Sequence, residues 1–259
     1  MKISVLSYSF RGLLADGKMD VFGYLESCKY RYGLAAADIW NNFLPTTDDA
    51  FIAKVKDALD ERELELVDLC VDRAHVWEDD ADAREQNHQV ALDHLKVAKT
   101  LGAKFMRVDA GSRTETWTDE QFELIVKRYR EYSQFAYDNG FKMGAENHWG
   151  AEAIWSNMKK LYEAVDHPGF GLSCHLRGWT GTEAEKDEAD RLMAPWVCHT
   201  HVPWNITEGP LTEKLTTLRD AGYKGYYSVE HHTGKNEYAE VAIQIARVRD
   251  VLDRWRLGE

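Results

Sequence analysis

Eight short segments rich in β-forming residues alternate with longer segments of helical period, and this alternation predicts an α/β fold, a single (β/α)8 TIM barrel spanning residues 1–259. Two further observations favour a closed barrel over a doubly wound open sheet. No glycine-rich phosphate loop follows the first predicted strand, and an open sheet of eight strands would leave two edges. The chain has only five prolines and no low-complexity tract, so nothing marks a boundary between two domains.

The predicted strands are short runs of apolar, β-branched and aromatic residues. Each is followed by a stretch that can be helical, which is the pattern of a repeated β/α unit. In chain order the eight strands are expected at Lys2–Tyr8, Leu34–Trp40, Leu64–Val71, Phe105–Asp109, Phe141–Glu146, Phe170–Cys174, Val197–Val202 and Tyr226–Glu230.

Capping signals mark several of the predicted helices. Thr47 and Asp48 precede Ala50–Glu61, as expected for an N-cap followed by acidic residues that favour the helix dipole. Thr118 and Gln121 have the spacing of a capping box. Glycines follow three of the predicted helices and indicate left-handed C-terminal caps: Gly102, Gly140 and Gly222.

Charge and composition exclude several classes of partner. The 32 basic and 44 acidic residues give a net charge of −12, which repels a phosphate backbone and argues against nucleic acid as a partner. No run of 18 apolar residues is present, and the segment MKISVLSYSF is too short and too polar for a signal sequence. We therefore expect a soluble, cytoplasmic protein with no membrane partner. The four cysteines are scattered without close pairing, which indicates reduced thiols.

Metal-ligating and acid/base residues collect at the ends of the last four predicted strands. A TIM barrel places its chemistry at the carboxyl ends of its strands, so these residues are expected at one rim. Side chains two residues apart on a strand share a face. The expected inward-facing pairs are Glu146 with His148, His199 with His201, and Glu230 with His232, and His175 follows the sixth strand.

Each of these residues has a structural interpretation when taken alone. A glutamate at a strand end is commonly a solvated charge or a helix cap, and a lone histidine is commonly a structural residue. Their coincidence on four consecutive strands, at the rim where this fold carries its sites, predicts a metal centre. Two carboxylates and two imidazoles suit one divalent ion per chain, with Mn²⁺, Co²⁺, Zn²⁺ or Fe²⁺ preferred over Mg²⁺.

The segments AENHWG, DHPGFGLSCH, VCHTHV and YYSVEHH resemble those that carry metal ligands in the xylose-isomerase-like sugar phosphate isomerase/epimerase superfamily. This superfamily includes ketose 3-epimerases, hydroxypyruvate isomerase and inosose dehydratase, and the resemblance covers nearly the whole chain. It implies a TIM barrel in which Glu146, His201 and Glu230 are metal ligands. It also implies a possible homo-oligomer, since relatives often form dimers or tetramers.

The sequence departs from the superfamily pattern at three positions. Relatives usually carry an aspartate at the end of strand six, where this chain has His175. If the imidazole replaces the carboxylate, the ligand set is Glu146, His175, His201 and Glu230, with one negative charge fewer and a preference for softer metals. Alternatively, the exchange weakens the metal site. Epimerase relatives tend to carry a substrate-binding histidine where Gly178 stands. A lysine suited to an anionic group is replaced by Pro203 and Trp204, which favours a neutral sugar over a sugar phosphate.

Further side chains around the rim are candidates for substrate binding. Arg107 could orient a substrate hydroxyl or carboxylate, or form an internal salt bridge with Asp109 or Asp72. Large aromatic residues at strand ends are equally consistent with core packing. The full set of expected substrate contacts is Arg107, Trp40, Asp38, His75, Trp204 and His232.

The predicted function is a metal-dependent isomerisation or epimerisation of a keto sugar or polyol ketone through an enediolate. Glu146 and Glu230 are expected to remove and return the proton, and His148 to supply a further acid or base. If His148 protonates a β-leaving oxygen, the protein is a lyase or dehydratase of 3-keto sugars. A non-catalytic sugar-binding barrel is the remaining alternative, while the net charge of −12 argues against a phosphodiesterase of the apurinic-endonuclease type.

Overall fold

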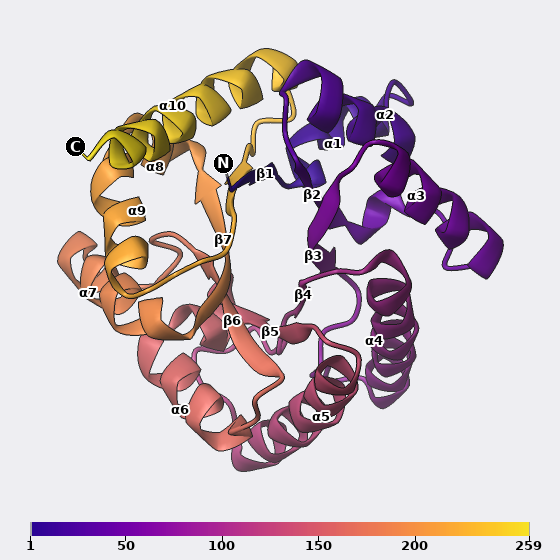
Figure 1. The fold of residues 1–259 in the computed structure, drawn as a ribbon. Helices are drawn as coiled ribbons and strands as arrows, with labels where there is room; N and C mark the ends of the chain where they lie inside the picture. Colours follow the sequence, from indigo (N-terminus) through magenta and orange to yellow (C-terminus); the bar gives the residue numbers. More distant parts are fainter. Residues whose placement is uncertain (1, 259) are drawn as a thin grey trace.

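Eight parallel strands form one sheet that curves around a central axis, with helices on the outside (Figure 1). The structure is a computed structural model, and it describes residues 2–258. In the sheet the strands follow the order β1-β8-β7-β6-β5-β4-β3-β2. Their bounds are β1 Ile3–Val5, β2 Ala36–Trp40, β3 Glu65–Val71, β4 Phe105–Val108, β5 Lys142–Glu146, β6 Phe170–His175, β7 Val197–Pro203 and β8 Tyr227–Glu230.

Between β1 and β2 the barrel closes through one isolated backbone bridge and through hydrogen bonds of the Tyr24 and Ser7 side chains. Leu6 and Asp38 form the isolated parallel bridge. The buried Tyr24 hydroxyl donates to the carbonyl oxygen of Val5 at 2.7 Å and accepts from the backbone nitrogen of Asp38 at 2.8 Å. The hydroxyl therefore links two strands that share only one backbone bridge. The predicted eight-stranded TIM barrel is confirmed.

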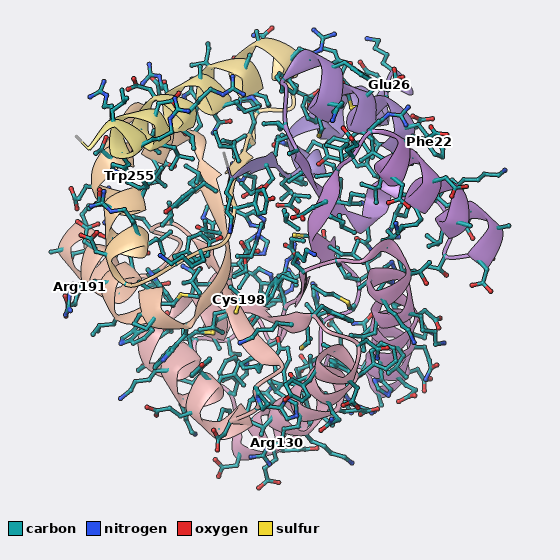
Figure 2. The ribbon with its side chains drawn as sticks, in the orientation of Figure 1. Phe22, Glu26, Arg130, Arg191, Cys198 and Trp255 are labelled. Atoms are coloured by element: carbon teal, nitrogen blue, oxygen red, sulfur yellow. The ribbon has the colours of Figure 1, made fainter. Side chains whose placement is uncertain are left out.

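The helices form the outer ring of the molecule, and charged side chains such as Glu26, Arg130 and Arg191 lie on its periphery (Figure 2). Arg130 also ties neighbouring helices together, because its Nε donates to the carbonyl oxygen of Val165. The α-helices are α1 Arg11–Ala15, α2 Val21–Glu26, α3 Asp49–Glu61, α4 Ala81–Leu101, α5 Asp119–Asp138, α6 Trp155–Val165, α7 Glu183–Met193, α8 Trp204–Glu208, α9 Leu211–Asp220 and α10 Glu237–Leu257. Shorter helical turns are η1 Ser7–Phe10, η2 Ser27–Arg31, η3 Asn41–Phe43, η4 Gly150–Ala153 and η5 Ala194–Trp196.

Most of the capping signals act as predicted, but Asp48, which precedes α3, makes no side-chain capping hydrogen bond. Thr118 and Gln121 form both hydrogen bonds of the capping box that opens α5. Gly102 takes the left-handed conformation at the end of α4, with φ of 74°. Gly140 and Gly222, which follow α5 and α9, also have positive φ. In the described part of the chain, no helix is long and apolar enough to cross a bilayer.

The interior of the barrel is unusually polar. Branched apolar side chains normally fill this space in a TIM barrel. Here it contains charged and polar side chains that are at most 4% exposed: Asp38, Asp68, Arg107, Glu146, His199 and His201. Buried charges are costly unless they are paired, so the arrangement of these groups determines what the site can bind.

Candidate metal centre and active site

The carboxyl ends of β5 to β8 bring the predicted site residues to one rim. Glu146 ends β5, His175 ends β6 and Glu230 ends β8, while His201 lies two residues before the end of β7. The strands are parallel and in register, with His175 paired to His201. Alternation along each strand then directs these side chains to the interior of the barrel.

Glu230 lies between two imidazoles at the rim. His175 Nε2 is 3.2 Å from Glu230 Oε2, and His232 Nε2 is 3.3 Å from Glu230 Oε1. One ligand atom from each of the three residues lies within 4.8 Å of the other two. Burial opposes ionisation of Glu230, but the two adjacent imidazoles hold its pKa well below the usual range. This carboxylate is therefore charged at neutral pH, with two nitrogen ligands beside it.

Glu146 forms a second buried carboxylate–imidazole pair. Its Oε1 lies 2.6 Å from His201 Nδ1, and its Oε2 lies 3.3 Å from Arg107 Nε. Burial raises the pKa of Glu146, but His201 and then Arg107 outweigh it and lower the pKa to about 2. Glu146 is thus a carboxylate held in its basic form.

His148 follows Glu146 and is paired with another carboxylate. Its Nδ1 lies 3.2 Å from Asp109 Oδ2. Burial lowers the pKa of His148, yet the Asp109 charge outweighs that effect and raises the pKa to about 9. His148 is therefore protonated at neutral pH and can donate a proton.

Arg107 forms internal salt bridges instead of remaining free for a substrate. Its Nη1 lies 3.0 Å from Asp72 and 3.1 Å from Asp109, and its Nε faces Glu146. The expected salt bridges of Arg107 with Asp109 and Asp72 are therefore present, and its guanidinium pairs with three carboxylates in all. A substrate contact by Arg107 stays a prediction.

The four predicted metal ligands come together as two pairs. His175 contacts Glu230, and His201 contacts Glu146, but the four residues do not form one closed set of ligand atoms in the described structure. His232, expected at the substrate, contacts Glu230 instead. The ligand set of Glu146, His175, His201 and Glu230 stays a prediction.

Asp38 lies beneath the rim, although the sequence analysis expected it at the substrate. Its side chain is fully buried, and its Oδ2 accepts a hydrogen bond from Ser228 Oγ at 2.6 Å. The same oxygen lies 2.8 Å from His199 Nε2 and 3.4 Å from His201 Nε2. Asp38 is therefore in position to orient the two histidines of β7, and it has no exposed surface for a sugar to contact.

Aromatic rings line the β1 and β2 side of the rim. Trp40 is half-buried, and its Nε1 donates to Asp72 Oδ2 at 2.7 Å. The Tyr8 ring centre lies 5.0 Å from that of Trp40 and 5.9 Å from that of His232. Tyr8 was not among the expected substrate contacts, and it lies in η1, shortly after β1. Its place at the carboxyl end of the expected first strand is the signal that could have identified it.

The other predicted substrate residues lie on the loops around the rim. His75 packs edge-on against Trp149, with ring centres 5.0 Å apart, and its Nδ1 lies 3.1 Å from Glu78. Trp204 begins α8 and packs against His231 at 5.7 Å. His75 and Trp204 thus contact protein neighbours, and their roles in binding stay predictions.

The donor set at the rim fits a divalent transition metal. In the part of the chain that the structure describes, Asp109 Oδ1 is a buried oxygen without a hydrogen-bond partner. Asp72, Asp109 and Glu146 share the Arg107 guanidinium, and Glu230 is paired with the imidazoles of His175 and His232. A cation bound by imidazole and carboxylate would balance the negative charge of these groups.

The family model for xylose isomerase-like TIM barrels matches residues 30–251. The chain belongs to the xylose isomerase-like TIM barrel family. No curated protein matches it at a significant level. Among solved structures, 3-keto-D-glucoside 4-epimerase YcjR from E. coli has a TM-score of 0.79 and 16% identity, covering 96% of this chain and 99% of that one.

Two further solved structures share the fold of this family member. D-psicose 3-epimerase from Clostridium cellulolyticum H10, in complex with D-tagatose, gives a TM-score of 0.76 at 18% identity and covers 99% of each chain. The probable 3-DHS dehydratase AsbF from Bacillus anthracis gives 0.70 at 14% identity, covering 98% of this chain and all of that one. At these identities the likeness establishes the fold, and different reactions occur on it.

Proposed function

We propose that this protein is a divalent-metal-dependent isomerase or epimerase that acts on a keto sugar through an enediolate. The observation that carries the proposal is the pair of ionised, buried carboxylates Glu146 and Glu230, which reach one rim from non-adjacent strands. Two bases that flank a substrate can remove a proton from one face and return it to another. The epimerases among the structural neighbours are consistent with this class.

One metal ion per chain is proposed at the rim, with Glu230, His175 and His232 as its ligands. When bound, a divalent ion at this place polarises the carbonyl and hydroxyl oxygens of a sugar and acidifies the adjacent C–H bond. The ligand set predicted from the sequence, which contains Glu146 and His201 in place of His232, is the competing assignment. Imidazole donors favour Mn²⁺, Co²⁺, Zn²⁺ or Fe²⁺ over Mg²⁺ in either case.

The protein side chains divide the proton transfers between them. Glu146 is held deprotonated by His201 and Arg107, so it is suited to remove the proton next to the carbonyl. Glu230 lies on the other side of the rim and is suited to return it. His148, with a pKa of about 9, is suited to donate a proton to a substrate oxygen.

The protonated His148 also supports a second candidate function. If the oxygen that it protonates is a leaving group β to the carbonyl, the enediolate eliminates, and the protein is a dehydratase or lyase of 3-keto sugars. The probable 3-DHS dehydratase among the structural neighbours is consistent with this second class.

A neutral small-molecule sugar is the proposed substrate. Tyr8 and Trp40 present aromatic surface, which suits the apolar face of a sugar ring. Arg107 is already shared by three carboxylates, which weakens its attraction for a phosphate group. A keto sugar or a 3-keto glycoside satisfies both conditions.

The proposal is tested by incubating the protein with ketoses and 3-keto glycosides and separating the products. An isomer or epimer of the same mass supports the proposed function, and a product lighter by one water supports the dehydratase. Glu230→Gln should reduce turnover by at least a hundredfold, while Glu163→Gln, an exposed glutamate on α6, serves as the control. Saturable sugar binding with no product would indicate a non-catalytic barrel.

A further inference from the structure

A cavity of about 310 Å³ opens at the end of the barrel where the strands begin, opposite the rim. Its lining includes Lys104, which directly precedes β4, Lys142, the first residue of β5, and Cys198, near the start of β7. Residues 221–225, the turn before β8, complete the wall. Cys198 lies close to the centre of the barrel in Figure 2. Pockets for small molecules begin at about 300 Å³, so this cavity can hold one small ligand.

The cavity is positively charged, although the protein as a whole is acidic. It is lined by Lys104, Lys142 and Lys224, and the lining that the structure describes includes no aspartate or glutamate. In the described part of the chain, no carboxylate lies within 4.0 Å of these three ammonium groups. Glu65, which begins β3 at the same end, instead accepts a hydrogen bond from the Tyr226 hydroxyl at 3.0 Å. Like charges without a counter-charge repel one another, so an anion between them is favourable.

The lysines are neighbours in space, although they are far apart in the sequence. The backbone N–H of Lys142 donates to the carbonyl oxygen of Lys104 at 3.1 Å, so these two residues lie side by side. Burial raises the pKa of the Cys198 thiol, and the charge of Lys142 opposes this rise, as expected for an ammonium near the sulfur that lines the cavity. Lys2 Nζ donates to the carbonyl oxygen of Lys224, which brings a fourth positive charge to this end of the barrel.

The 221–225 turn supplies hydrogen-bond donors as well as a charge. Gly225 is required in it, because a Cβ atom at this position would lie 2.3 Å from the Tyr223 hydroxyl oxygen. That hydroxyl donates to the carbonyl oxygen of Tyr226 at 2.7 Å and so fixes the turn. Over the described residues, the backbone N–H groups of Lys224 and Gly225 donate to no protein acceptor. Free N–H groups in a turn are suited to bind the oxygens of an anion.

We propose that this cavity binds a small phosphate-bearing anion. The ammonium groups of Lys104, Lys142 and Lys224 contact the phosphate oxygens, and the N–H groups of the 221–225 turn donate to the same group. Lysine binds phosphate as a point charge, so the site needs no fixed fork of donors. The cavity holds one small molecule, while the net charge of −12 repels a long phosphate polymer.

This anion site is separate from the reactive rim, because the two lie at opposite ends of the strands. Its walls come from β4, β5, β7 and the turn before β8, which meet only in the folded barrel. A ligand that binds the folded chain and not the unfolded one stabilises the fold by mass action. The anion is therefore expected to raise the stability of the barrel without taking part in sugar chemistry.

Calorimetric titration at about 0.15 M ionic strength tests the site with three separate probes: inorganic phosphate, pyrophosphate and glucose 6-phosphate. We expect saturable binding of one probe molecule per chain, with pyrophosphate tighter than inorganic phosphate because it carries more charge. If glucose 6-phosphate binds more tightly than inorganic phosphate, the ligand is an organic phosphate. Equal affinity for these two would mean that the phosphate group alone is recognised.

Lys104→Met and Lys142→Met should each weaken pyrophosphate binding on the order of tenfold or more. Lys127→Met, which removes an exposed lysine on α5, should leave it unchanged. Without ligand, the urea midpoints of the two cavity variants should match that of the wild type, since their ammonium groups lose no carboxylate partner. Pyrophosphate should raise the wild-type midpoint more than theirs.

Three results would overturn the proposal. They are the absence of saturable binding for every probe, equal affinity of the wild type and the double variant Lys104→Met/Lys142→Met, and an equal loss of affinity in Lys127→Met. Equal affinity in the double variant would place the bound anion elsewhere on the protein. Since no readout involves a sugar or its turnover, the outcome is independent of the proposed function.

Discussion

His175 is the residue that most directly sets the chemistry of the rim. Its imidazole lies 3.2 Å from Glu230, at the strand end where the resemblance described above implies an aspartate. We expect an imidazole in this place to lower the negative charge by one and to favour softer metal ions. Glu230 then carries the charge of this rim cluster alone.

Replacing His175 tests its role as a ligand. His175→Ala should weaken binding of the proposed rim metal on the order of tenfold or more, since it removes a nitrogen donor beside Glu230. His175→Asp should move the preference towards Mn²⁺ or Mg²⁺. Competition titrations with a chromophoric chelator measure both effects, with His167→Ala, which precedes the start of β6, as control. Unchanged affinity and preference would exclude His175 from the ligand set.

Arg107 is expected to be the most sensitive charged residue for stability. Replacing it with Met leaves Asp109 and Glu146 buried without their guanidinium, and this should cost about 3–5 kcal/mol of unfolding free energy. Urea titration of the two proteins measures the difference. A variant as stable as the wild type would show that bound cations or protonation neutralise these carboxylates.

The sequence identifies most rim residues but not their pairing. The strand ends and the two-residue alternation are sufficient to bring Glu146, His175, His201 and Glu230 to one interior. Which imidazole contacts which carboxylate depends on rotamers and on the height of each strand in the barrel. For this reason Asp38, expected at the substrate, lies a layer deeper, against His199 and Ser228.

At the scale of elements, the turn η4 after β5 places another buried carboxylate near the site. Glu152 Oε1 accepts a hydrogen bond from the backbone nitrogen of Ala110 at 2.7 Å, which joins this turn to the end of β4. Burial, and then the nearby Asp109 charge, raise the pKa of Glu152 well above its usual value. The folded protein therefore keeps a proton on Glu152 that the unfolded chain releases.

This proton makes stability depend on pH. Because the folded pKa of Glu152 exceeds the unfolded one, its effect should lower stability as pH rises above about 4.3, by at most about 1.4 kcal/mol per pH unit. Glu152→Gln should remove this contribution and gain stability relative to the wild type between pH 5 and pH 8. Urea unfolding at several pH values tests this, and parallel curves for the two proteins would contradict it.

The elements themselves were largely predictable. Capping residues and helix-ending glycines marked helix ends that the structure confirms at α4 and α5. The first strand is the exception, since it was expected to reach Tyr8 and ends at Val5. Ser9 donates its backbone N–H to Leu6 at 2.9 Å, and Ser7 Oγ accepts from the backbone of Trp40, so local hydrogen bonds turn the chain into η1.

For the whole molecule, closure of the barrel determines whether the two sides of the rim face each other. Tyr24 bridges β1 and β2 where backbone pairing is reduced to one isolated bridge. A pattern of strands and helices predicts that such a barrel closes, but it does not show which side chain completes the closure.

Tyr24→Phe tests this closure. It leaves the ring in place and removes the hydroxyl, so Val5 and Asp38 lose a buried partner at a cost of about 1–3 kcal/mol. Chemical denaturation measures the loss, with Tyr137→Phe, which is exposed, as the control. Equal stability of the wild type and Tyr24→Phe would show that closure of the barrel does not depend on the Tyr24 hydroxyl.

The measurement that tests the central claim most directly is solvent deuterium exchange at the carbon next to the carbonyl of a keto sugar. The account predicts exchange by the metal-loaded protein, loss of exchange after the chelator removes the rim metal, and recovery on adding Mn²⁺ or Co²⁺. Exchange that is unaffected by chelation, or a metal-loaded protein that binds keto sugars without exchanging deuterium, would contradict it.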